Sequence, residues 1–497
     1  MTDSIEEVDV VIVGAGISGI SMAHQIGADH PDLSYLILEN RERIGGTWDL
    51  FRYPGIRSDS GMGTFGFSFR PWTGDKHFGQ GAEIRDYLEE TAAEFGIDRH
   101  IRFNRRVVAA DWSSDRSRWT VTVEQSGGST DGSANGSGPP LPGRSQISCR
   151  FLIGCTGYYR YDQGFSPKFE GEEDFRGELF HTQHWPEDLE VRDRRVVVVG
   201  SGATAITVVP ALAASGAQVT MLQRSPSYVM SIPDSGGIGE LIHRRFSRRR
   251  AAWLNRWLGV LMEIAQFNLA RKFPNFFRRL FIKGARKQLP GNFDKRHLNP
   301  KYDPWTQRVC FAPDGDFFAA IRSGRARIET GNIERITSDR IRLREGGEIE
   351  ADVIVKATGL ELLIFGDIEM SVDGEPVDPP EHLVYKGAML SGVPNFVFVV
   401  GYTNASWTLK SELIAKFASR FISEVEASGA RSGMPVAPEK KMETVPLLNL
   451  DSGYIKRAQA RLPLAGDTSP WVLHQNYFSD RRELLRANMQ DDAITYR

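Results

Sequence analysis

The sequence predicts an α/β protein with two dinucleotide-binding domains of the Rossmann type, and three observations lead to this prediction. A G-x-G-x-x-G turn follows a buried-strand pattern near the N-terminus, at residues 14–19. A G-x-G-x-x-A turn follows a second apolar strand, at residues 200–205. Two similar strand ends, at 156–157 and 358–359, mark where the chain leaves and re-enters the first domain. We therefore expect the first domain to be discontinuous.

The N-terminal turn has the features of a pyrophosphate site. Gly14 permits a tight turn, Gly16 lets the backbone approach a phosphate, and Gly19 lets the following helix pack close to the strand. The next strand, "SYLILE", ends at Glu39, twenty residues past Gly19, where an acid binds ribose hydroxyls. A glycine turn without a ligand is the alternative, and this context disfavours it.

The first site continues into "ENRERIGGTWDLFRYPGIRSDS". Gly45 and Gly46 form a second turn that a ligand can approach, and Trp48 offers a flat face. This extended surface suits a bulky cofactor such as FAD better than a second nicotinamide. Two nucleotide sites in one chain imply two cofactors that exchange electrons.

The second turn contains Gly200, Gly202 and Ala205, and the strand after it ends in Gln223 and Arg224 instead of an acid. A cation at this position suits a 2′-phosphate, and no carboxylate is present to repel one. The pattern therefore favours NADPH over NADH. Arg224 as a solvated surface residue is the alternative.

These motifs divide the chain into four parts. We expect the first part of the FAD domain at 1–165 and a linker at 166–190. The NADPH domain follows at 191–340, including a helical basic insertion at 240–290, and 341–497 completes the FAD domain. Within the first part, residues 126–144 are expected to form the polar tip of a hairpin, with no assigned function.

Composition excludes several other classes of protein. The 497 residues are 41% hydrophobic with a net charge of −2, so nothing indicates nucleic acid. Cys149, Cys155 and Cys310 cannot form a disulfide framework, and acids near the N-terminus argue against a signal peptide. Apolar stretches at 196–219 and 387–409 are broken by glycine and proline, so no membrane span is expected. We expect a cytoplasmic protein.

The stretch "FRGELFHTQHWPED", residues 175–188, fits neither a helix face nor an alternating strand. His181 and His184 suggest zinc, but no further Cys or His pair lies nearby, so no metal site is expected. The stretch lies between the first strand end and the second glycine turn, and therefore on the predicted linker. Its pattern is F-x-G-x-x-x-H-x-x-x-W-P, with Phe175, Gly177, His181, Trp185 and Pro186.

With both glycine turns and "GGTWDLFRYPGIRSD" in order, this linker pattern resembles the signature of the type I Baeyer–Villiger monooxygenases, within the class B flavin-containing monooxygenases. The segments "YDPWTQRVC", "PDGDFFAAI" and "GYTNASWTLK" are similar to the ethionamide-activating group of that family. The resemblance covers nearly the whole chain. It implies FAD and NADPH as cofactors, O2 and a small-molecule ketone, thioether or thioamide as substrates, and no nucleic acid.

The resemblance also implies the chemistry. NADPH reduces FAD, oxygen adds at flavin C4a, and the peroxide attacks a ketone carbonyl to give an ester or lactone. Arg308 matches the family's catalytic arginine, and Asp59 matches the acid that contacts flavin and holds it. One alternative is oxygenation of sulfur or nitrogen through the same flavin species. Another is a reductase that passes electrons on without oxygenating, which the linker pattern and Arg308 disfavour.

The residues expected to contact the cofactors follow from these motifs. For FAD they are Gly14, Gly16, Ser18, Gly19, Glu39, Gly46, Thr47, Trp48, Asp49, Asp59 and Val107. For NADPH they are Gly200, Ser201, Gly202, Ala203, Thr204, Ala205, Arg224 and Ser225. His181 and Trp185 are expected to position the linker while one domain moves over the other, and His181 is not expected to transfer a proton.

Two departures from the family pattern affect these expectations. Gln307 precedes Arg308 where many members have lysine, so NADPH preference depends more on Arg224. Gly61 and Gly63 stand where bulkier or acidic residues are common, which leaves the nearby flavin and substrate contacts open.

The segment 244–287 differs from the rest of the chain in holding thirteen Lys or Arg and one acid, Glu263. Apolar and basic residues alternate at helical spacing in its second half. We expect helices that pack an apolar face on the NADPH domain, with contact to an anionic membrane as the alternative. Both hold if a lipophilic substrate enters from a bilayer. The apolar side is expected to contain Phe276, Phe277, Leu280 and Phe281.

Overall fold

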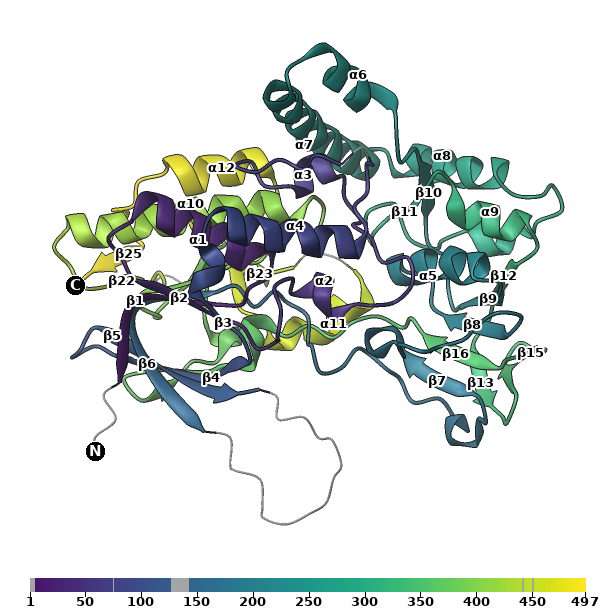
Figure 1. The fold of residues 1–497 in the computed structure, drawn as a ribbon, viewed down its shortest axis with the longest axis horizontal. Helices are drawn as coiled ribbons and strands as arrows, with labels where there is room; N and C mark the ends of the chain where they lie inside the picture. The colour runs from purple at the N-terminus through teal and green to yellow at the C-terminus, as the bar shows by residue number, and fades with distance from the viewer. Residues whose placement is uncertain (1–4, 75, 127–142, 440–441, 449–450) are drawn as a thin grey trace.

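The computed structural model describes residues 5–74, 76–126, 143–439, 442–448 and 451–497 (Figure 1). The loop expected at 126–144 therefore falls mostly outside the described residues. The strands on either side of it, β5 (Arg118–Gln125) and β6 (Arg144–Gly154), pair antiparallel as the expected hairpin.

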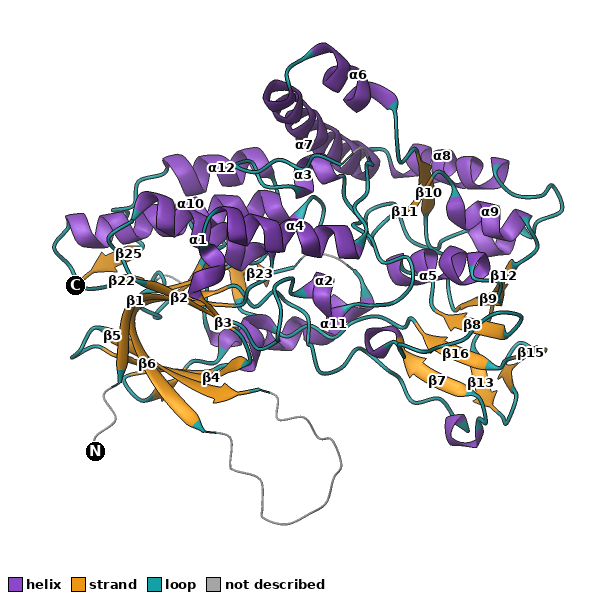
Figure 2. Cartoon of the chain, in the orientation of Figure 1, coloured by secondary structure: helices purple, strands orange, loops and turns teal. Residues whose placement is uncertain are grey.

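The larger sheet is built around β1 (Glu6–Val13), which is parallel to β2 (Tyr35–Leu38) on one side and to β6 on the other. Side chains of β1 alternate between two cores, with Val10 and Ile12 in one and Val11 and Val13 in the other. Burial on both faces explains the uninterrupted apolar run. The helices α1 (Ile17–Asp29), α4 (Gly81–Glu94) and α10 (Trp407–Ala427) contribute to the first core and lie on one side of the sheet (Figure 2).

Other strands complete this sheet. They are β3 (Ile101–Arg102), β4 (Arg105–Ser113), β17 (Glu369–Val372), β18 (Glu375–Pro376), β19 (Val384–Tyr385), β20 (Met389–Leu390) and β21 (Phe396–Phe398). Strand β21 pairs with the last residues of β6, so segments from both ends of the chain build one domain. The first domain is therefore discontinuous, as predicted.

The second sheet is entirely parallel, in the order β12-β9-β8-β16-β7. Its strands are β7 (Glu178–His181), β8 (Arg195–Val199), β9 (Gln218–Gln223), β12 (Ala326–Thr330) and β16 (Val353–Lys356). One face packs on α5 (Ala203–Ala214) and α9 (Asp316–Arg322). The other face packs on a meander of β13 (Ile333–Ile336), β14 (Arg340–Leu343) and β15 (Glu348–Glu350). The molecule thus has the two predicted Rossmann-type domains.

The strand pairing bears on the domain limits. Strand β16 pairs with β8, although the predicted boundary at 340/341 assigned it to the FAD domain, and β7 comes from the predicted linker. We therefore propose to extend the NADPH domain through β16 and to count β7 within it. Spacing along the sequence could not reveal this, because β16 reaches its neighbours only through the tertiary fold.

Two crossover segments connect the domains, one after β6 and one after β16. They pair with each other in antiparallel fashion, with a bridge between Tyr159 and Leu362. The amide of Arg160 donates to the carbonyl of Glu361 (2.9 Å), and the amide of Phe165 donates to that of Gly359 (3.0 Å). The domains are therefore joined by a two-stranded ribbon, which we call the crossover ribbon.

The basic insertion is helical, as predicted, with α6 (Gly237–Arg245), α7 (Arg248–Lys272) and α8 (Pro274–Lys287) (Figure 1). Helix α8 packs on the NADPH side, where Phe281 contacts a core with Tyr228 and Trp305. Helix α7 contacts both domains. Its middle packs on the FAD domain, against α3 (Met62–Phe65) and, through Val260, against Leu409. Near its C-terminal end, Phe267 and Ala270 pack on the same core as Phe281. The insertion therefore packs on the NADPH domain, and the middle of α7 packs on the FAD domain as well, which the sequence did not predict.

Two charged residues attach α7 to the FAD domain. Glu263 accepts hydrogen bonds from the Thr64 hydroxyl (2.6 Å) and from the amide of Ser406, which caps the N-terminus of α10 (3.1 Å). Arg256 forms an ion pair with Glu412. The carboxylate of Glu263 thus faces the positive end of a helix dipole, although burial raises its pKa. The one acid within 244–287 is therefore bonded to the FAD domain.

The remaining elements are shorter. They are α2 (Thr47–Leu50), α11 (Gly453–Ala458), α12 (Tyr477–Arg486), β10 (Val229–Ile232), β11 (Cys310–Pro313), β22 (Gly433–Pro435), β23 (Thr444–Pro446), β24 (Leu464–Gly466) and β25 (Ile494–Tyr496). Among the helices described, none has the length and apolar character needed to cross a bilayer.

Candidate active site

A cavity of about 1160 Å³ lies between the two domains. Both glycine turns line it, together with the crossover ribbon, the Gln307–Phe311 segment and α11. This volume exceeds the roughly 300–1,000 Å³ of common small-molecule sites. The cavity has room for extended ligands, and the two predicted nucleotide sites open into one space.

The first turn is tightly enclosed by its neighbours. Gly14 has φ of +105°, and a Cβ there would lie 2.7 Å from the carbonyl oxygen of Cys155. A Cβ at Gly19 would lie only 1.9 Å from the carbonyl oxygen of Gly14. Gly19 does not line the cavity, so it serves the close packing of helix and strand that the sequence predicted.

Glu39 lies at the end of β2, where the sequence predicted a ribose-binding acid. The amides of Ala15 (2.7 Å) and Arg41 (2.9 Å) each donate to one of its carboxylate oxygens. Burial raises the pKa of Glu39, while these two hydrogen bonds oppose that rise. Each oxygen keeps a lone pair, so this oriented carboxylate can still accept hydroxyl groups from a ligand in the cavity.

Other predicted FAD residues line the same end of the cavity, namely Gly16, Ser18, Gly46, Thr47, Trp48, Asp59 and Val107. The indole N–H of Trp407 donates to the hydroxyl of Ser18 (2.9 Å), which ties the start of α10 to the first turn of α1. Asp49 does not reach the cavity. It is buried and forms an ion pair with Arg41 (2.6 Å), so it supports the wall from behind.

The second turn lines the opposite end through Gly200, Ser201, Gly202, Ala203 and Thr204, followed by Arg224 and Ser225. Gln223, which occupies the position of the usual acid, is buried and donates to the carbonyl of His297 (3.0 Å) and to Thr330 (2.9 Å). Arg224 is exposed beside it. Ala205 is fully buried in the domain core and does not line the cavity.

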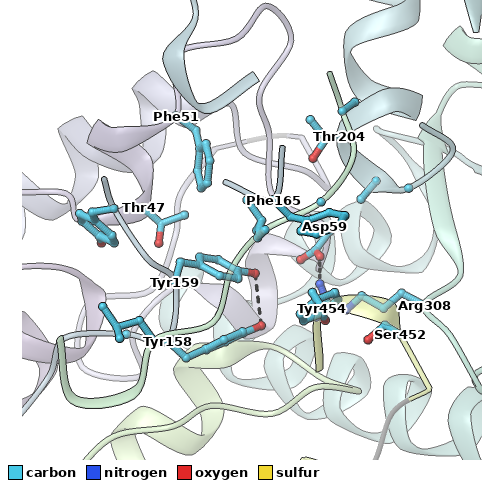
Figure 3. A pocket seen from close by; sticks show the side chains of 18 of the residues that line it. Thr47, Phe51, Asp59, Tyr158, Tyr159, Phe165, Thr204, Arg308, Ser452 and Tyr454 are labelled. Atoms are coloured by element: carbon cyan, nitrogen blue, oxygen red, sulfur yellow. Dashed lines mark hydrogen bonds and ion pairs between the residues drawn. The ribbon is translucent and has the colours of Figure 1, made fainter. Parts of the chain in front are cut away.

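Arg308 and Asp59 form an ion pair within the cavity, one from each domain (Figure 3). The Nε of Arg308 also donates to the carbonyl of Thr403 (3.3 Å), which fixes the guanidinium plane. Burial acts to lower the pKa of Arg308, but Asp59 and the neighbouring tyrosines together raise that pKa above its usual value. Arg308 therefore stays a cation at every pH at which the protein is folded.

Aromatic side chains surround this pair. Tyr158 and Tyr159 lie on the crossover ribbon with their hydroxyls 3.2 Å apart, and Tyr454 of α11 lies beside Arg308 (Figure 3). Burial raises the pKa of both ribbon tyrosines, so they remain neutral. None of these three tyrosines was predicted from the sequence as a cavity residue. The ribbon tyrosines follow the Thr156-Gly157 strand end directly, which was the available signal; Tyr454 had none.

The "FRYPGIRSD" segment also connects the domains, a role that the sequence reading did not foresee. Arg57 forms an ion pair with Asp316 of α9 (2.6 Å), and the Tyr53 hydroxyl lies beside Thr204 of the second turn. Burial raises the pKa of Tyr53 to about 12. A segment predicted to contact flavin therefore also positions the NADPH domain.

The linker signature lies outside the main cavity and holds the crossover ribbon. His181 Nε2 donates to the carbonyl of Gly359 (3.0 Å), while its Nδ1 accepts from the amide of Gln183 (3.1 Å). The Gln183 side chain donates to the carbonyls of Arg160 (3.0 Å) and Tyr161 (2.8 Å). Burial lowers the pKa of His181, so the ring is neutral with one fixed tautomer. These contacts support the proposed positioning role.

The other signature residues pack against the second domain. A Cβ at Gly177 would lie 2.2 Å from the carbonyl oxygen of Asp352, so no larger residue fits there. Trp185 meets Phe180 edge to face (5.1 Å) beside the core of the NADPH domain, and Pro186 follows it. Phe175 packs on the opposite face of the same sheet.

The departure at Gly61 has a structural explanation, because a Cβ there would lie 2.6 Å from the ring of His77. A Cβ at Gly63 would make only an ordinary contact with Asn255 of α7 (3.7 Å), so nothing in the structure requires glycine there. Neither glycine lines the cavity. Gln307 lines the cavity next to Arg308 but carries no charge.

Two dinucleotide turns that open into one cavity, with a fixed guanidinium between them, define a two-cofactor oxidoreductase. The chain belongs to the flavin-binding monooxygenase-like family, whose model matches residues 7–288. This membership sets aside the alternative of a reductase that does not oxygenate. The protein is a flavin monooxygenase.

Similar proteins support this assignment. The chain is 46% identical to the FAD-containing monooxygenase EthA of Mycobacterium tuberculosis, over 99% of this chain and 98% of that protein. A steroid monooxygenase bound to NADP shares the fold with a TM-score of 0.71 and 22% identity, covering 87% of this chain and 88% of the other. An OTEMO complex with FAD and NADP gives 0.69 and 22%, covering 87% of both chains.

The residues present fit the two cofactors. The closed turn at Gly14, with Glu39 at the end of the next strand, suits the pyrophosphate and ribose of FAD. At the second turn, a Cβ on Gly202 would meet nothing within 4 Å, which leaves space for a second pyrophosphate. One guanidinium nitrogen of Arg57 is buried at the cavity without a hydrogen-bond partner, and a ligand acceptor would satisfy it.

Proposed function

We propose that this enzyme is a Baeyer–Villiger monooxygenase that inserts one oxygen atom next to a ketone carbonyl. The products are an ester or lactone, water and NADP⁺, formed from the ketone, O2, NADPH and a proton. The main observation in support is the Arg308–Asp59 ion pair, which holds a permanent cation in the cavity where the two domains meet. Bound FAD, once reduced, would supply the activated oxygen.

The role proposed for Arg308 follows from charge. The oxygen that attacks a ketone carbonyl is anionic, and the resulting tetrahedral adduct is an oxyanion as well. A guanidinium that cannot lose its proton stabilises both throughout the reaction. Asp59 and the carbonyl of Thr403 hold this guanidinium in place, so little reorganisation is needed at the moment of reaction.

The walls of the cavity suit a lipophilic ketone. Phe51, Tyr159, Phe165 and Tyr454 present aromatic surface near the ion pair, which a bound apolar ligand would help to shield from water (Figure 3). A steroid monooxygenase of the same fold is in keeping with a bulky apolar substrate. We propose thioethers and thioamides as substrates of a secondary sulfoxidation.

The alternative is an enzyme that mainly oxygenates sulfur or nitrogen. Those atoms are nucleophiles, so they take oxygen from a protonated, electrophilic donor, whereas a ketone needs an anionic one. The ratio of ketone to thioether oxidation should therefore rise with pH. A falling or constant ratio between pH 6.5 and 9 would favour the alternative.

An Arg308→Ala variant tests the proposal most directly. It should retain FAD and be reduced by NADPH, yet form ester at least about a hundredfold more slowly, equivalent to about 2.7 kcal/mol. Arg308→Lys keeps a cation without the planar guanidinium, so its rate of ester formation should lie between those of the parent and the alanine variant. Ester formation by the alanine variant within tenfold of the parent would remove Arg308 from the catalytic role.

We propose, in addition, that the insertion docks on an anionic lipid surface. Eight of the fourteen large hydrophobic side chains described as exposed lie within 244–287, and the one acid there is bonded to the FAD domain. They are Phe246, Trp253, Leu261, Met262, Leu269, Phe273, Phe276 and Leu280. Exposed apolar groups among basic ones suit a headgroup region.

The structure corrects the apolar side predicted for α8. Phe277 and Phe281 pack inward, and only Phe276 and Leu280 remain exposed. Arg278 donates to the carbonyl of Pro300 (2.8 Å) and therefore helps to hold the helix. The bases available to a surface on α8 are Arg279, Lys283, Arg286 and Lys287.

Flotation with anionic vesicles tests this contact. The parent should float at low salt and be released near 1 M, where the Debye length is about 3 Å. Each engaged base is worth about 1 kcal/mol, so a variant with glutamate at the four available α8 bases should remain unbound. A control carries glutamate at four exposed bases elsewhere, namely Arg99, Lys168, Arg192 and Lys416. Equal behaviour of the two variants, or no flotation of the parent, would overturn the proposal.

A further inference from the structure

A second arginine shares the NADPH end of the cavity with Arg224. Arg344 lines the cavity there, together with Gly331 and Asn332. The sequence reading did not identify it, because it lies 120 residues beyond Arg224 in a hairpin. Among the described residues of 191–340 and of the following β14–β15 turn, no carboxylate lines the cavity. This end therefore carries positive charge without acidic neighbours on its surface.

The strand register brings the two arginines to the same edge. Gln223, the last residue of β9, pairs with Thr330, the last residue of β12. The amide of Gly331 donates to the carbonyl of Gln223 (3.0 Å), and the amide of Arg344 donates to the carbonyl of Asn332 (2.9 Å). Arg224 thus follows the carboxyl end of β9 directly, and Arg344, which follows β14, is held beside the carboxyl end of the adjacent β12 through Asn332. The adenosine ribose of a dinucleotide lies at this edge of the sheet.

Other arginines of the hairpin are already engaged. Arg340 pairs with Glu348 (2.9 Å), as does Arg342 (2.7 Å). Glu345, next to Arg344, accepts instead from the amide (2.8 Å) and the side-chain amide (2.6 Å) of Asn332. Within the part of the chain that the structure describes, the side chains of Arg224 and Arg344 form no hydrogen bond or ion pair.

We propose that Arg344 is a second recognition residue for the 2′-phosphate of NADPH, opposite Arg224. Two guanidinium groups at this edge of the sheet can each donate to a phosphate dianion. Arg344 would supply the second cation at this subsite, which the uncharged Gln307 cannot provide. The proposal rests on the assignment of the second turn to NADPH and on the role of Arg224. It is independent of ketone oxygenation.

Nucleotide binding and anaerobic flavin reduction by the FAD-loaded enzyme test this inference without any ketone. In Arg344→Ala, the dissociation constants of NADPH and of adenosine 2′,5′-bisphosphate should rise about tenfold. Those of NADH and 5′-AMP should change less than twofold. Arg224→Ala should behave alike, and Arg344→Lys should retain part of the preference. Arg342→Ala is the matched control, because this neighbour pairs with Glu348 and does not line the cavity.

Two results would overturn the inference. One is an equal loss of affinity for phosphorylated and unphosphorylated nucleotides in Arg344→Ala, which would show a general structural effect. The other is a preference for NADPH over NADH that stays within twofold of the parent value in both Arg344→Ala and Arg344→Glu. If Arg308→Ala stops ester formation while Arg344→Ala leaves nucleotide preference unchanged, the proposed function stands and this inference fails.

Discussion

The two glycine turns share one pattern but differ in how closely the protein surrounds them. At the first position the two turns are alike, because a Cβ at Gly14 would lie 2.7 Å from the carbonyl oxygen of Cys155 and one at Gly200 would lie 2.2 Å from that of Ala357. They differ at the second position and beyond. Around the first turn, Gly46 lies 3.5 Å from the Cβ position of Gly16, and Trp407 donates a hydrogen bond to Ser18. Around the second, the Cβ position of Gly202 has no neighbour within 4 Å. The first turn suits a cofactor that stays bound, and the second suits one that enters and leaves during each catalytic cycle.

The third position of each turn makes the difference sharper. In the first turn it is Gly19, whose Cβ would overlap a backbone oxygen, and in the second it is Ala205, whose methyl group is buried without conflict. The FAD turn thus has a closer approach of helix to strand. The same motif serves permanent and exchangeable binding because the surroundings, and not the motif, set the degree of enclosure.

A substitution that disrupts the first glycine turn should have the largest effect on stability and flavin content. Gly19→Ala places a methyl group 1.9 Å from the carbonyl oxygen of Gly14, which cannot move without shifting the strand. We expect a loss of about 3 kcal/mol or more of stability and protein purified largely without flavin. The absorbance of bound flavin measures this. Gly27→Ala on the same helix is the control, since its methyl group would make only an ordinary contact with Tyr35 (3.7 Å). Full flavin content in Gly19→Ala would contradict the comparison.

We expect the stability of the protein to decrease in acid because of His181, which lies at the junction between the two domains. Burial lowers the pKa of His181 in the folded protein below the value of about 6.5 in unfolded chains. The unfolded state therefore binds more protons below that pH, so stability is lost as pH falls through about 6.5 and levels off below the folded pKa. The free energy of unfolding in urea should fall less steeply between pH 7.5 and 5 for His181→Gln than for the parent. Parallel curves would show that His181 does not contribute.

One hydroxyl of the "FRYPGIRSD" segment lies beside the second turn, and removing it should have a smaller effect. Tyr53→Phe removes this hydroxyl from beside Thr204, and a polar contact of this kind is worth about 1 kcal/mol. We expect NADP⁺ to bind up to about fivefold more weakly while the flavin content stays unchanged. Titration of the FAD-loaded enzyme with NADP⁺ measures this. Loss of flavin would mean that the two turns are not independent.

The smallest effect on cofactor binding is expected at Ala205, which occupies in the second turn the position of Gly19 in the first. Ala205→Gly restores glycine to the third position of the second turn, at a cost of about 1 kcal/mol in helix stability. Flavin retention should not change, and NADPH should reduce the flavin at nearly the parent rate. Thermal unfolding and stopped-flow reduction measure these two properties. A faster or tighter reaction with NADPH would show that this turn, too, favours closer packing.

The sequence predicted those parts of the site that depend on neighbouring residues. Both turns, Glu39, Arg224 and the linker pattern are local, because a strand, a turn and a helix start require particular residues at fixed spacing. The two-domain fold followed from the same motifs. The family resemblance, and not spacing, pointed to Arg308 and Asp59, and the structure then places these two residues together.

The features that the sequence reading missed depend on contacts between distant residues. Arg344 reaches the cavity only through the pairing of β9 with β12, and Tyr53 meets Thr204 only across the domain junction. Periodicity showed that the insertion has apolar faces, but it could not show which domain α7 would cover. Phe277 and Phe276 are adjacent in the chain, yet one packs inward and the other is exposed.

The crossover ribbon limits how the two halves can move. A single connecting strand would act as a swivel, free to turn about several bonds, whereas two paired strands resist twisting and leave bending as the easy motion. Since the amide of Arg160 bonds Glu361 and that of Phe165 bonds Gly359, we expect the ribbon to act as a hinge with one main axis. Any swing of the NADPH domain should then follow a fixed arc, so that Arg308 returns to Asp59 at the end of each stroke.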